Sequence, residues 1–584
     1  MKSLRAAPAL IASLLFIAPP AGIVTQPKPS PAFAAFVDKY LDNFAKRHPS
    51  IAGGNGIHQH DDLLEDFSAA GIRAEIDGLK RERSELRAFD SSKLTPDERV
   101  DQKILDGIID GWLLEQETLE NWKRNPMLYA SSFADGVHNL MTMENAPAPV
   151  RMRRIISKLH ELPKLLAAAR ANIANPPKLF AQRGVTMFRG ASGVLGGDLR
   201  LAFGDQGTPA LRDSLFKAAE SARTLIDSYV AYLEKDVVPK ASGDFTVGAM
   251  ALSRRFAAEE LVDTPLDEMV RVGERELKAS QTAFRAAAAK IDPKRDAIEI
   301  FRDGSGEHPP IGGVIPFTQR IVDSLTAFVR AKNLATVPTD EKVIVAQSQP
   351  FDIGAASMHA SPPLEAVPVK SFFYTNESKS TGDSAQDAAI VRRSSKYGAT
   401  ITASHEAMPG HWLHSIYMRK TPGKIRRIWI GLNPFPQPSS GQDGWAHYAE
   451  QLIADQGYGG AENPRYVMAQ QSDALMRICR MLSGIKVHTK QWTLEQAQEC
   501  FEKEAFLNPN SAKRESERSA YDPTYGGYFL GKRGFLKLRK DLQAKLGAKF
   551  DLKKFHESIM YNGIAPIWAH RALLLPGDKS AIID

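Results

Sequence analysis

Apolar residues recur at helical spacing over most of this chain, and this periodicity limits its fold more than any other feature. In residues 93–123 the apolar side chains share one face, and Thr95 with Glu98 predicts a capping box at the start of a helix. The same spacing predicts helices over 147–173, 209–234, 264–290, 317–332, 463–486, 494–505 and 528–546. Strand patterns are confined to 342–346 and 367–375. The sequence therefore predicts a mainly α body with a small β-sheet.

Composition gives no reason to divide this body into domains. Loops rich in proline, glycine and serine at 303–316, 347–364 and 433–444 interrupt the helices without a linker between them. The chain has 75 Lys and Arg against 68 Asp and Glu, a formal charge of +7, and no basic block that indicates nucleic acid as a partner. We expect a single helical domain over 35–584 and no segment after the N-terminus that inserts into a membrane.

The N-terminus has the three-part pattern of a secretory signal peptide. Lys2 and Arg5 precede an apolar run over 6–24, and small residues end a polar stretch at Ala34. An anchor helix needs about 20 unbroken apolar residues, and prolines interrupt this run. We predict a signal peptide over 1–34, with cleavage after Ala21 as the alternative, and a periplasmic or secreted protein. The oligomeric state stays open.

Two cysteines, Cys479 and Cys500, are the only ones in the chain. Their separation of 21 residues matches no metal-site spacing. An exported protein meets oxidising conditions, in which they can pair. A disulfide and two buried thiols remain equal alternatives.

The chemistry indicated most clearly lies around His405, Glu406 and His411. A His-Glu pair is typical of zinc hydrolases, in which the histidine binds the metal and the glutamate takes a proton from water. The usual second histidine four residues on is absent, because that position holds Pro409. On a regular helix the two histidines would lie about 240° apart, but they would fall within about 40° if Pro409 and Gly410 looped out. The alternatives are a bulged zinc-binding helix and a kinked helix with surface histidines.

A second polar stripe can complete such a site. Asp443, His447 and Glu450 share one face of an amphipathic segment, opposite its apolar residues. A carboxylate from a second helix is the usual third ligand of a catalytic zinc. The alternative is an ordinary solvated helix face.

A third element combines tyrosines with glycines over 521–531. A phenol such as that of Tyr528 or Tyr525 is neutral at pH 7 and can donate a hydrogen bond to an oxyanion. The alternative is a tyrosine-rich turn before the next helix.

These motifs together resemble a known bacterial family. They are the string His405-Glu-Ala-Met-Pro-Gly-His411, then Gly444-Trp-Ala-x-Tyr448-x-Glu450, then Tyr528-x-x-Gly531. They resemble the family called domain of unknown function 885, and the resemblance runs from Gly56 to Pro566. Its members are usually described as predicted zinc peptidases. The resemblance therefore implies a large, helical, cleft-shaped body like that of a zinc peptidase, with two histidines and one acid on the metal.

Two positions depart from the family pattern. The chain has Asp443 and His447 where the family usually has glutamate and leucine. If the first acid is the third ligand, Asp443 is one methylene shorter than the usual residue. His447 can supplement or replace it, and Glu450 is either an alternative ligand or an acid behind the ligands.

The hypothesis that follows is a zinc metallopeptidase for short peptides, with one Zn²⁺ per chain. His405 and His411 bind the metal, with Asp443 or Glu450 as third ligand, and Glu406 is the general base. The remaining roles fall to Tyr528 or Tyr525 as oxyanion donor, Arg518 as partner of a substrate carboxylate, and Phe373 and Tyr374 in a strand that adds a peptide at its edge. The alternatives are an inactive peptide-binding or ligand-binding pseudoenzyme and a zinc hydrolase of non-peptide amides or esters.

Overall fold

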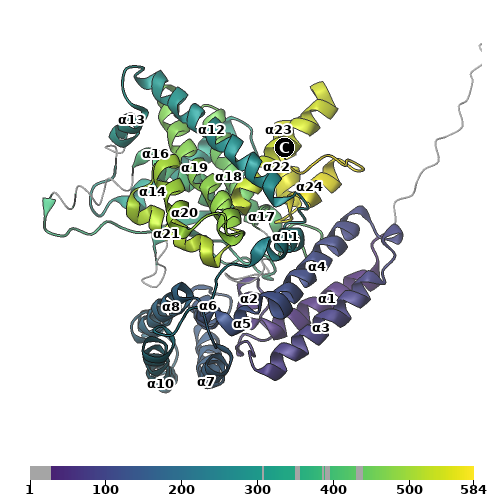
Figure 1. Ribbon diagram of the computed structural model, residues 1–584, viewed down its shortest axis with the longest axis vertical. Coiled ribbons are helices and arrows are strands. Elements are labelled where there is room, and N and C mark those ends of the chain that lie inside the picture. Colours follow the sequence, from purple (N-terminus) through teal and green to yellow (C-terminus); the bar gives the residue numbers. More distant parts are fainter. Residues whose placement is uncertain are drawn as a thin grey trace, which may run out of the picture.

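The computed structural model describes residues 28–304, 308–348, 356–384, 387, 395–428 and 439–583. These residues are mainly helical with one small sheet, which confirms the predicted fold class. Figure 1 shows the purple and blue N-terminal helices gathered on one side of the molecule and the teal to yellow helices on the other. Among the described helices, none has the length and apolar character needed to cross a membrane.

The N-terminal helices bury their apolar faces in a common core that includes Trp112, Tyr129 and Phe188. They are α1 (Pro31–Arg47), α2 (Pro49–Gly54), α3 (Ala69–Arg87), α4 (Pro96–Leu114), α5 (Asn121–Arg124), α6 (Pro126–Thr142), α7 (Ala148–Asn172), α8 (Lys178–Gly196), α9 (Asp198–Phe203) and α10 (Pro209–Tyr232). The predicted capping box starts α4: the Thr95 side chain accepts from the Glu98 N–H at 3.2 Å, and the Thr95 N–H donates to the Glu98 carboxylate at 2.9 Å.

The helices that follow form further cores, of which the two largest lie around Trp445 and around Leu475. They are α11 (Gly248–Glu259), α12 (Leu266–Ile291), α13 (Ala297–Gly304), α14 (Val314–Ala331), α16 (Lys396–Glu406), α17 (His411–Met418), α18 (Asp443–Asp455), α19 (Asn463–His488), α20 (Leu494–Glu499), α21 (Pro509–Tyr521), α22 (Gly527–Leu546), α23 (Leu552–Tyr561) and α24 (Ile567–Leu574). The long helices α12 and α19 pack side by side (Figure 1).

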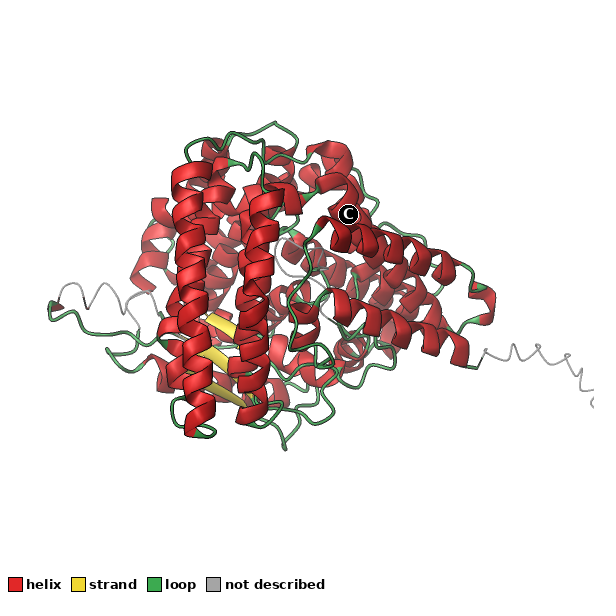
Figure 2. Cartoon of the chain, turned by 90° about the horizontal axis from the view of Figure 1, so that it is seen from below, coloured by secondary structure: helices red, strands yellow, loops and turns green. Residues whose placement is uncertain are grey.

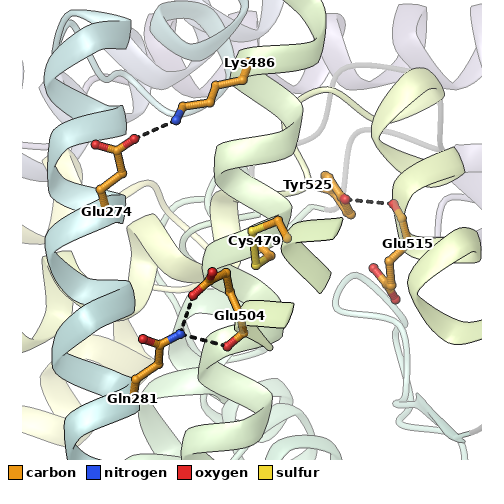
Figure 3. Close-up of a disulfide and its surroundings, with 8 residues drawn as sticks. Glu274, Gln281, Cys479, Lys486, Glu504, Glu515 and Tyr525 are labelled. Carbon is orange, nitrogen blue, oxygen red and sulfur yellow. Dashed lines mark hydrogen bonds and ion pairs between the residues drawn. A yellow bond between two sulfur atoms is a disulfide. The ribbon is translucent and has the colours of Figure 1, made fainter. Parts of the chain in front are cut away.

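A disulfide resolves the alternative left open for the cysteines. Cys479 on α19 is bonded to Cys500, which directly follows α20 (Figure 3). Nearby, Lys486 on α19 pairs with Glu274 on α12 at 2.6 Å. The disulfide and the ion pair fix α19 to the segments beside it. Helix α19 carries Arg477, which is described with the candidate metal centre below.

The sheet has three short strands within the described residues: β1 (Val343–Gln347), β2 (Ala356–His359) and β3 (Ser371–Thr375). Their order is β1-β3-β2, with β1 parallel and β2 antiparallel to β3, and Figure 2 shows them among the helices. Because β3 is the central strand, both of its edges are already paired. The prediction that a peptide adds at the edge of the strand holding Phe373 and Tyr374 is therefore wrong. Strand β2 lies in the stretch 347–364 that we expected to be a loop.

The start of α1 bears on the expected signal cleavage. Residues 1–27 lie outside the described residues, so most of the predicted signal peptide does too. Ser30 caps α1 and Phe33 is buried in the N-terminal core. Cleavage after Ala34 would remove this first turn, whereas cleavage after Ala21 would leave it whole.

Candidate metal centre

The chain breaks its helix between the two histidines of the central motif. Helix α16 ends at Glu406 and α17 begins at His411, and the ring centroids of His405 and His411 lie 4.7 Å apart. Only glycine fits at Gly410, because a Cβ there would lie 1.7 Å from the carbonyl oxygen of His405. His405 is buried, so the two rings meet inside the protein. This is the arrangement that the bulged-helix interpretation predicts.

Helix α18 brings a carboxylate to the two rings. The Asp443 Oδ1 lies 3.4 Å from the His411 Nε2 and 3.7 Å from the His405 Nε2. In a tetrahedral zinc site with bonds of about 2.0–2.2 Å, ligand atoms lie about 3.4 Å apart. Within the described part of the chain these three residues are the group whose ligand atoms all fall within 4.8 Å of one another. The donor set therefore fits a zinc ion, and the shorter side chain of Asp443 reaches both histidines.

Two contacts set the position of Asp443. Gly444 faces Gly531 of α22 so closely that a Cβ on Gly444 would lie 2.4 Å from the Gly531 Cα. The buried Trp445 indole donates to the carbonyl oxygen of Pro409 at 3.0 Å. The glycine pair draws α18 against α22, and the indole ties α18 to the break between α16 and α17.

Glu450 lies behind the ligands and not among them. Its carboxylate accepts from His405 Nδ1 at 2.8 Å, from His447 Nδ1 at 2.9 Å and from Arg477 at 2.8 Å. Although burial favours the neutral acid, Arg477 and His447 hold the pKa of Glu450 well below its ordinary value. With Nδ1 engaged in this way, His405 directs Nε2 toward Asp443, because a carboxylate on one ring nitrogen fixes the orientation of the other.

The polar stripe of α18 is therefore not a solvated face. His447 and Glu450 have no exposed surface, which overturns that alternative. The Nδ1 of His447 forms a hydrogen bond with the Oε2 of Glu450. His447 belongs to no group of described residues with metal-ligand spacing. The structure separates the three acids and histidines of this stripe into one candidate ligand, Asp443, and two residues behind it.

Glu406 lies next to the candidate ligands with its carboxylate unengaged by hydrogen bonds from the described residues. Burial raises its pKa, Asp443 adds to the rise, and the neighbouring histidines and Arg477 oppose it. Asp443 itself has a lowered pKa: burial acts to raise it, but His405 and His411 outweigh that effect. The pKa values of the two neighbouring acids are therefore shifted in opposite directions, down for Asp443 and up for Glu406.

The tyrosines divide in the same way. The Tyr528 ring stacks on His405 with centroids 6.3 Å apart, and its hydroxyl has no hydrogen-bond partner among the described residues. Burial and Asp443 raise the pKa of Tyr528 to about 12, so the phenol keeps its proton. Tyr525 is buried and donates to the carbonyl oxygen of Glu515 at 3.0 Å (Figure 3). Tyr528 is thus available to a substrate and Tyr525 is already engaged.

Three arginines gather at this end of the site, and each has a carboxylate partner. Arg518 pairs with Asp522 at 2.9 Å, Arg480 pairs with Glu515 at 2.8 Å through two hydrogen bonds, and Arg477 pairs with Glu450. Arg477 and Arg480 were missed by the sequence analysis. The signal for them was present, since both cations interrupt an apolar run of a predicted helix.

A cavity of about 860 Å³ opens beside the candidate metal centre. Phe373 of β3 lies in its wall. Tyr374 does not, and its ring packs against that of His359 with centroids 4.9 Å apart. The cavity comes closest to the site at Thr402, one turn before Glu406, and at Asp473, whose carboxylate is 3.7 Å from Arg477. No candidate ligand lines the cavity, but its wall reaches to within about one turn of Glu406 on α16 and of Arg477 on α19.

The comparisons identify the family and the fold of the chain, and none of them names an activity. Residues 49–571 match the family described as "Bacterial protein of unknown function (DUF885)". A "putative lipoprotein of unknown function" from Shewanella oneidensis has a TM-score of 0.78 at 22% identity over 94% of this chain and 100% of that chain. A "putative lipoprotein" from Colwellia psychrerythraea has a TM-score of 0.75 at 16% identity over 93% and 98%. No curated protein matches. The chain therefore belongs to the bacterial family of unknown function DUF885.

Proposed function

We propose that this protein is an exported zinc-dependent metallopeptidase that hydrolyses short peptides. The observation that carries the proposal is the meeting of His405, His411 and Asp443 beside Glu406, with a second-shell acid behind His405. This donor set is that of a catalytic zinc with one position left for water or substrate. Export is supported by the lipoprotein descriptions of the two structural neighbours.

A zinc ion held by the three ligands would supply Lewis-acid activation of water and of the scissile carbonyl. In this proposal Glu406 takes the proton from the attacking water and passes it to the leaving amine. Its raised pKa suits both steps, because a base that is too acidic transfers the proton poorly.

Tyr528 stabilises the oxyanion. Its protonated hydroxyl is free to donate, and its ring is held against His405 on one side. The guanidinium groups of Arg477 and Arg480 lie 5.7 and 5.5 Å from the ring centroid. Both guanidinium groups are paired with carboxylates, so in this proposal the Tyr528 hydroxyl and not a free cation faces the oxyanion.

The first test is the metal content of the purified protein, measured by elemental analysis beside a His405→Ala, His411→Ala double variant. We expect about one zinc per chain, lost in the double variant. The absence of metal in the wild type, even after zinc is added, would favour an inactive binding protein instead.

The second test separates the base from the metal site. Glu406→Gln should keep zinc and lose peptide hydrolysis by a factor of roughly 10² or more. Glu161→Gln is the matched control, because Glu161 also follows a histidine but lies on α7 and pairs with Lys164. Turnover that survives in Glu406→Gln would refute the role of Glu406. Zinc with esterase or amidase activity but no peptide cleavage would move the function to non-peptide substrates.

A further inference from the structure

The cavity beside the candidate metal centre runs along two helices. Along α16 its wall includes the N-cap Ser395, then Ala399 and Thr402, spaced three or four residues apart, and the same face continues to Glu406. On α19 its wall includes Arg465 and Asp473, and the same helix continues to Arg477 behind the ligands. The wall of the cavity therefore reaches to within about one helical turn of Glu406 on α16 and of Arg477 on α19.

The distance from the candidate metal centre to the far end of the cavity follows from helix geometry. From Arg477 to Arg465 the helix α19 rises about 18 Å, and from Glu406 to Ser395 the helix α16 rises about 16 Å. An extended peptide advances about 3.3 Å per residue. The distance from the candidate metal centre to Arg465 thus corresponds to an extended segment of about five residues.

The acids in this cavity are already engaged. Glu377 accepts the backbone N–H of Val314 at 2.6 Å at the start of α14. Asp473 lies 3.7 Å from the guanidinium of Arg477. The wall between the ends is largely apolar, with Phe301, Phe317, Phe373 and Met468.

Arg465 at the far end differs from the arginines near the metal ligands. Its guanidinium carbon lies 5.7 Å from the ring centroid of Tyr397, and no carboxylate of the described residues lies within ion-pair distance of it. Arg477, Arg480 and Arg518, in contrast, all have carboxylate partners. Arg302 and the exposed side chain of Lys379 add further positive charge to the lining. The far end of the cavity is therefore ready to receive an anion.

We propose that this cavity binds the C-terminal part of a peptide, with Arg465 holding the terminal carboxylate about five residues from the cleaved bond. The proposal rests on the proposed peptidase function and specifies its substrate class. A guanidinium pairs well with a carboxylate, and the apolar wall favours uncharged side chains between the carboxylate and the bond. The position of the cleaved bond would then lie at a fixed distance from the C-terminus of the substrate.

The test uses peptides of four to twelve residues with either a free C-terminal carboxylate or an amide. Cleavage products are identified by mass spectrometry with the zinc-loaded full-length protein. We expect cleavage to keep its distance from the C-terminus as residues are added at the N-terminus. We also expect amidation to lower kcat/KM by about 10- to 100-fold, mainly through KM, as for the loss of a charge-assisted contact.

Substitutions at Arg465 then decide its part. Arg465→Gln should abolish the preference for the carboxylate, Arg465→Lys should keep part of it, and the exposed Arg275→Gln on α12 should leave it unchanged. If wild type cleaves acid and amide peptides equally, or if Arg465→Gln keeps the preference, the proposal is overturned while the peptidase function stands.

Direct binding separates this proposal from the peptidase function. Calorimetric titration of wild type and Arg465→Gln with the same acid and amide peptides needs no turnover. Acid-selective binding that is lost in Arg465→Gln would support the cavity assignment even for a protein that cleaves nothing. Equal binding of both peptides, or no binding, would overturn it.

Discussion

Replacing Glu450 by glutamine tests whether this acid positions His405 or binds the metal. Glutamine keeps the size of the side chain but loses the charge that faces three donors on His405, His447 and Arg477. Loss of a second-shell partner lowers metal affinity by about 10- to 100-fold, or about 1.4–2.7 kcal/mol. Breaking a buried ion pair also costs about 3 kcal/mol or more of the free energy of unfolding, because Arg477 keeps only the more distant Asp473.

Competition with a chromogenic chelator measures the zinc affinity, and elemental analysis at saturating zinc measures the stoichiometry. We expect Glu450→Gln to bind one zinc per chain, weakly. Glu515→Gln is the matched control, since it breaks the neighbouring ion pair with Arg480 and touches neither histidine. It should lower stability and leave the zinc affinity unchanged. An unchanged affinity in Glu450→Gln, or complete loss of zinc at saturation, would refute the positioning role.

Three further predictions concern other parts of the chain. Burial acts to lower the pKa of His58, but hydrogen bonds to two carboxylates outweigh it and raise it to about 9. The protonated His58 should therefore add about 2 kcal/mol to the free energy of unfolding, after a discount for solvent screening. This contribution should be complete below pH ~6.5 and lost as the pH rises through about 9, as chemical denaturation of wild type and His58→Asn can measure. Gly531→Ala, which crowds Gly444, should cost about 1–3 kcal/mol and weaken zinc binding, as unfolding and chelator competition can show. A chain starting after Ala34 should lose about 3 kcal/mol of unfolding free energy by losing the buried Phe33, and equal stability to a chain starting at residue 22 would contradict this.

Most of the longer amphipathic helices could be predicted from the sequence, because amphipathic periodicity is a local property, whereas helices such as α3 and α8 were not among those predicted. The capping box at Thr95 and the long helix that became α19 follow from residues within a few turns of one another. Strand β2 could not be found in this way. Its four residues are a short run without β-branched residues, and it forms because β3 offers a free edge to pair with.

The members of the candidate site were also visible in the sequence, but their roles were not. The motif around His405 and the stripe from Asp443 to Glu450 contained both the candidate ligands and the acid behind them. Side-chain identity could not separate Asp443 from Glu450, since both are carboxylates on one helix face. The packing of α18 decided it, by bringing Asp443 to two Nε2 atoms and Glu450 to the Nδ1 of His405.

The sequence by itself determined the helical class, the broken helix at Pro409 and Gly410, and the pool of residues available for chemistry. Only the tertiary structure decided which of them meet. The approach of Gly444 to Gly531 joins helices almost 90 residues apart, and the central place of β3 closes an edge that its own residues leave open. The same holds for Arg465, whose lack of an acidic partner among the described residues depends on the segments that pack around it. Local patterns are set by neighbours along the chain, whereas ligand geometry, burial and charge pairing are set by neighbours in space.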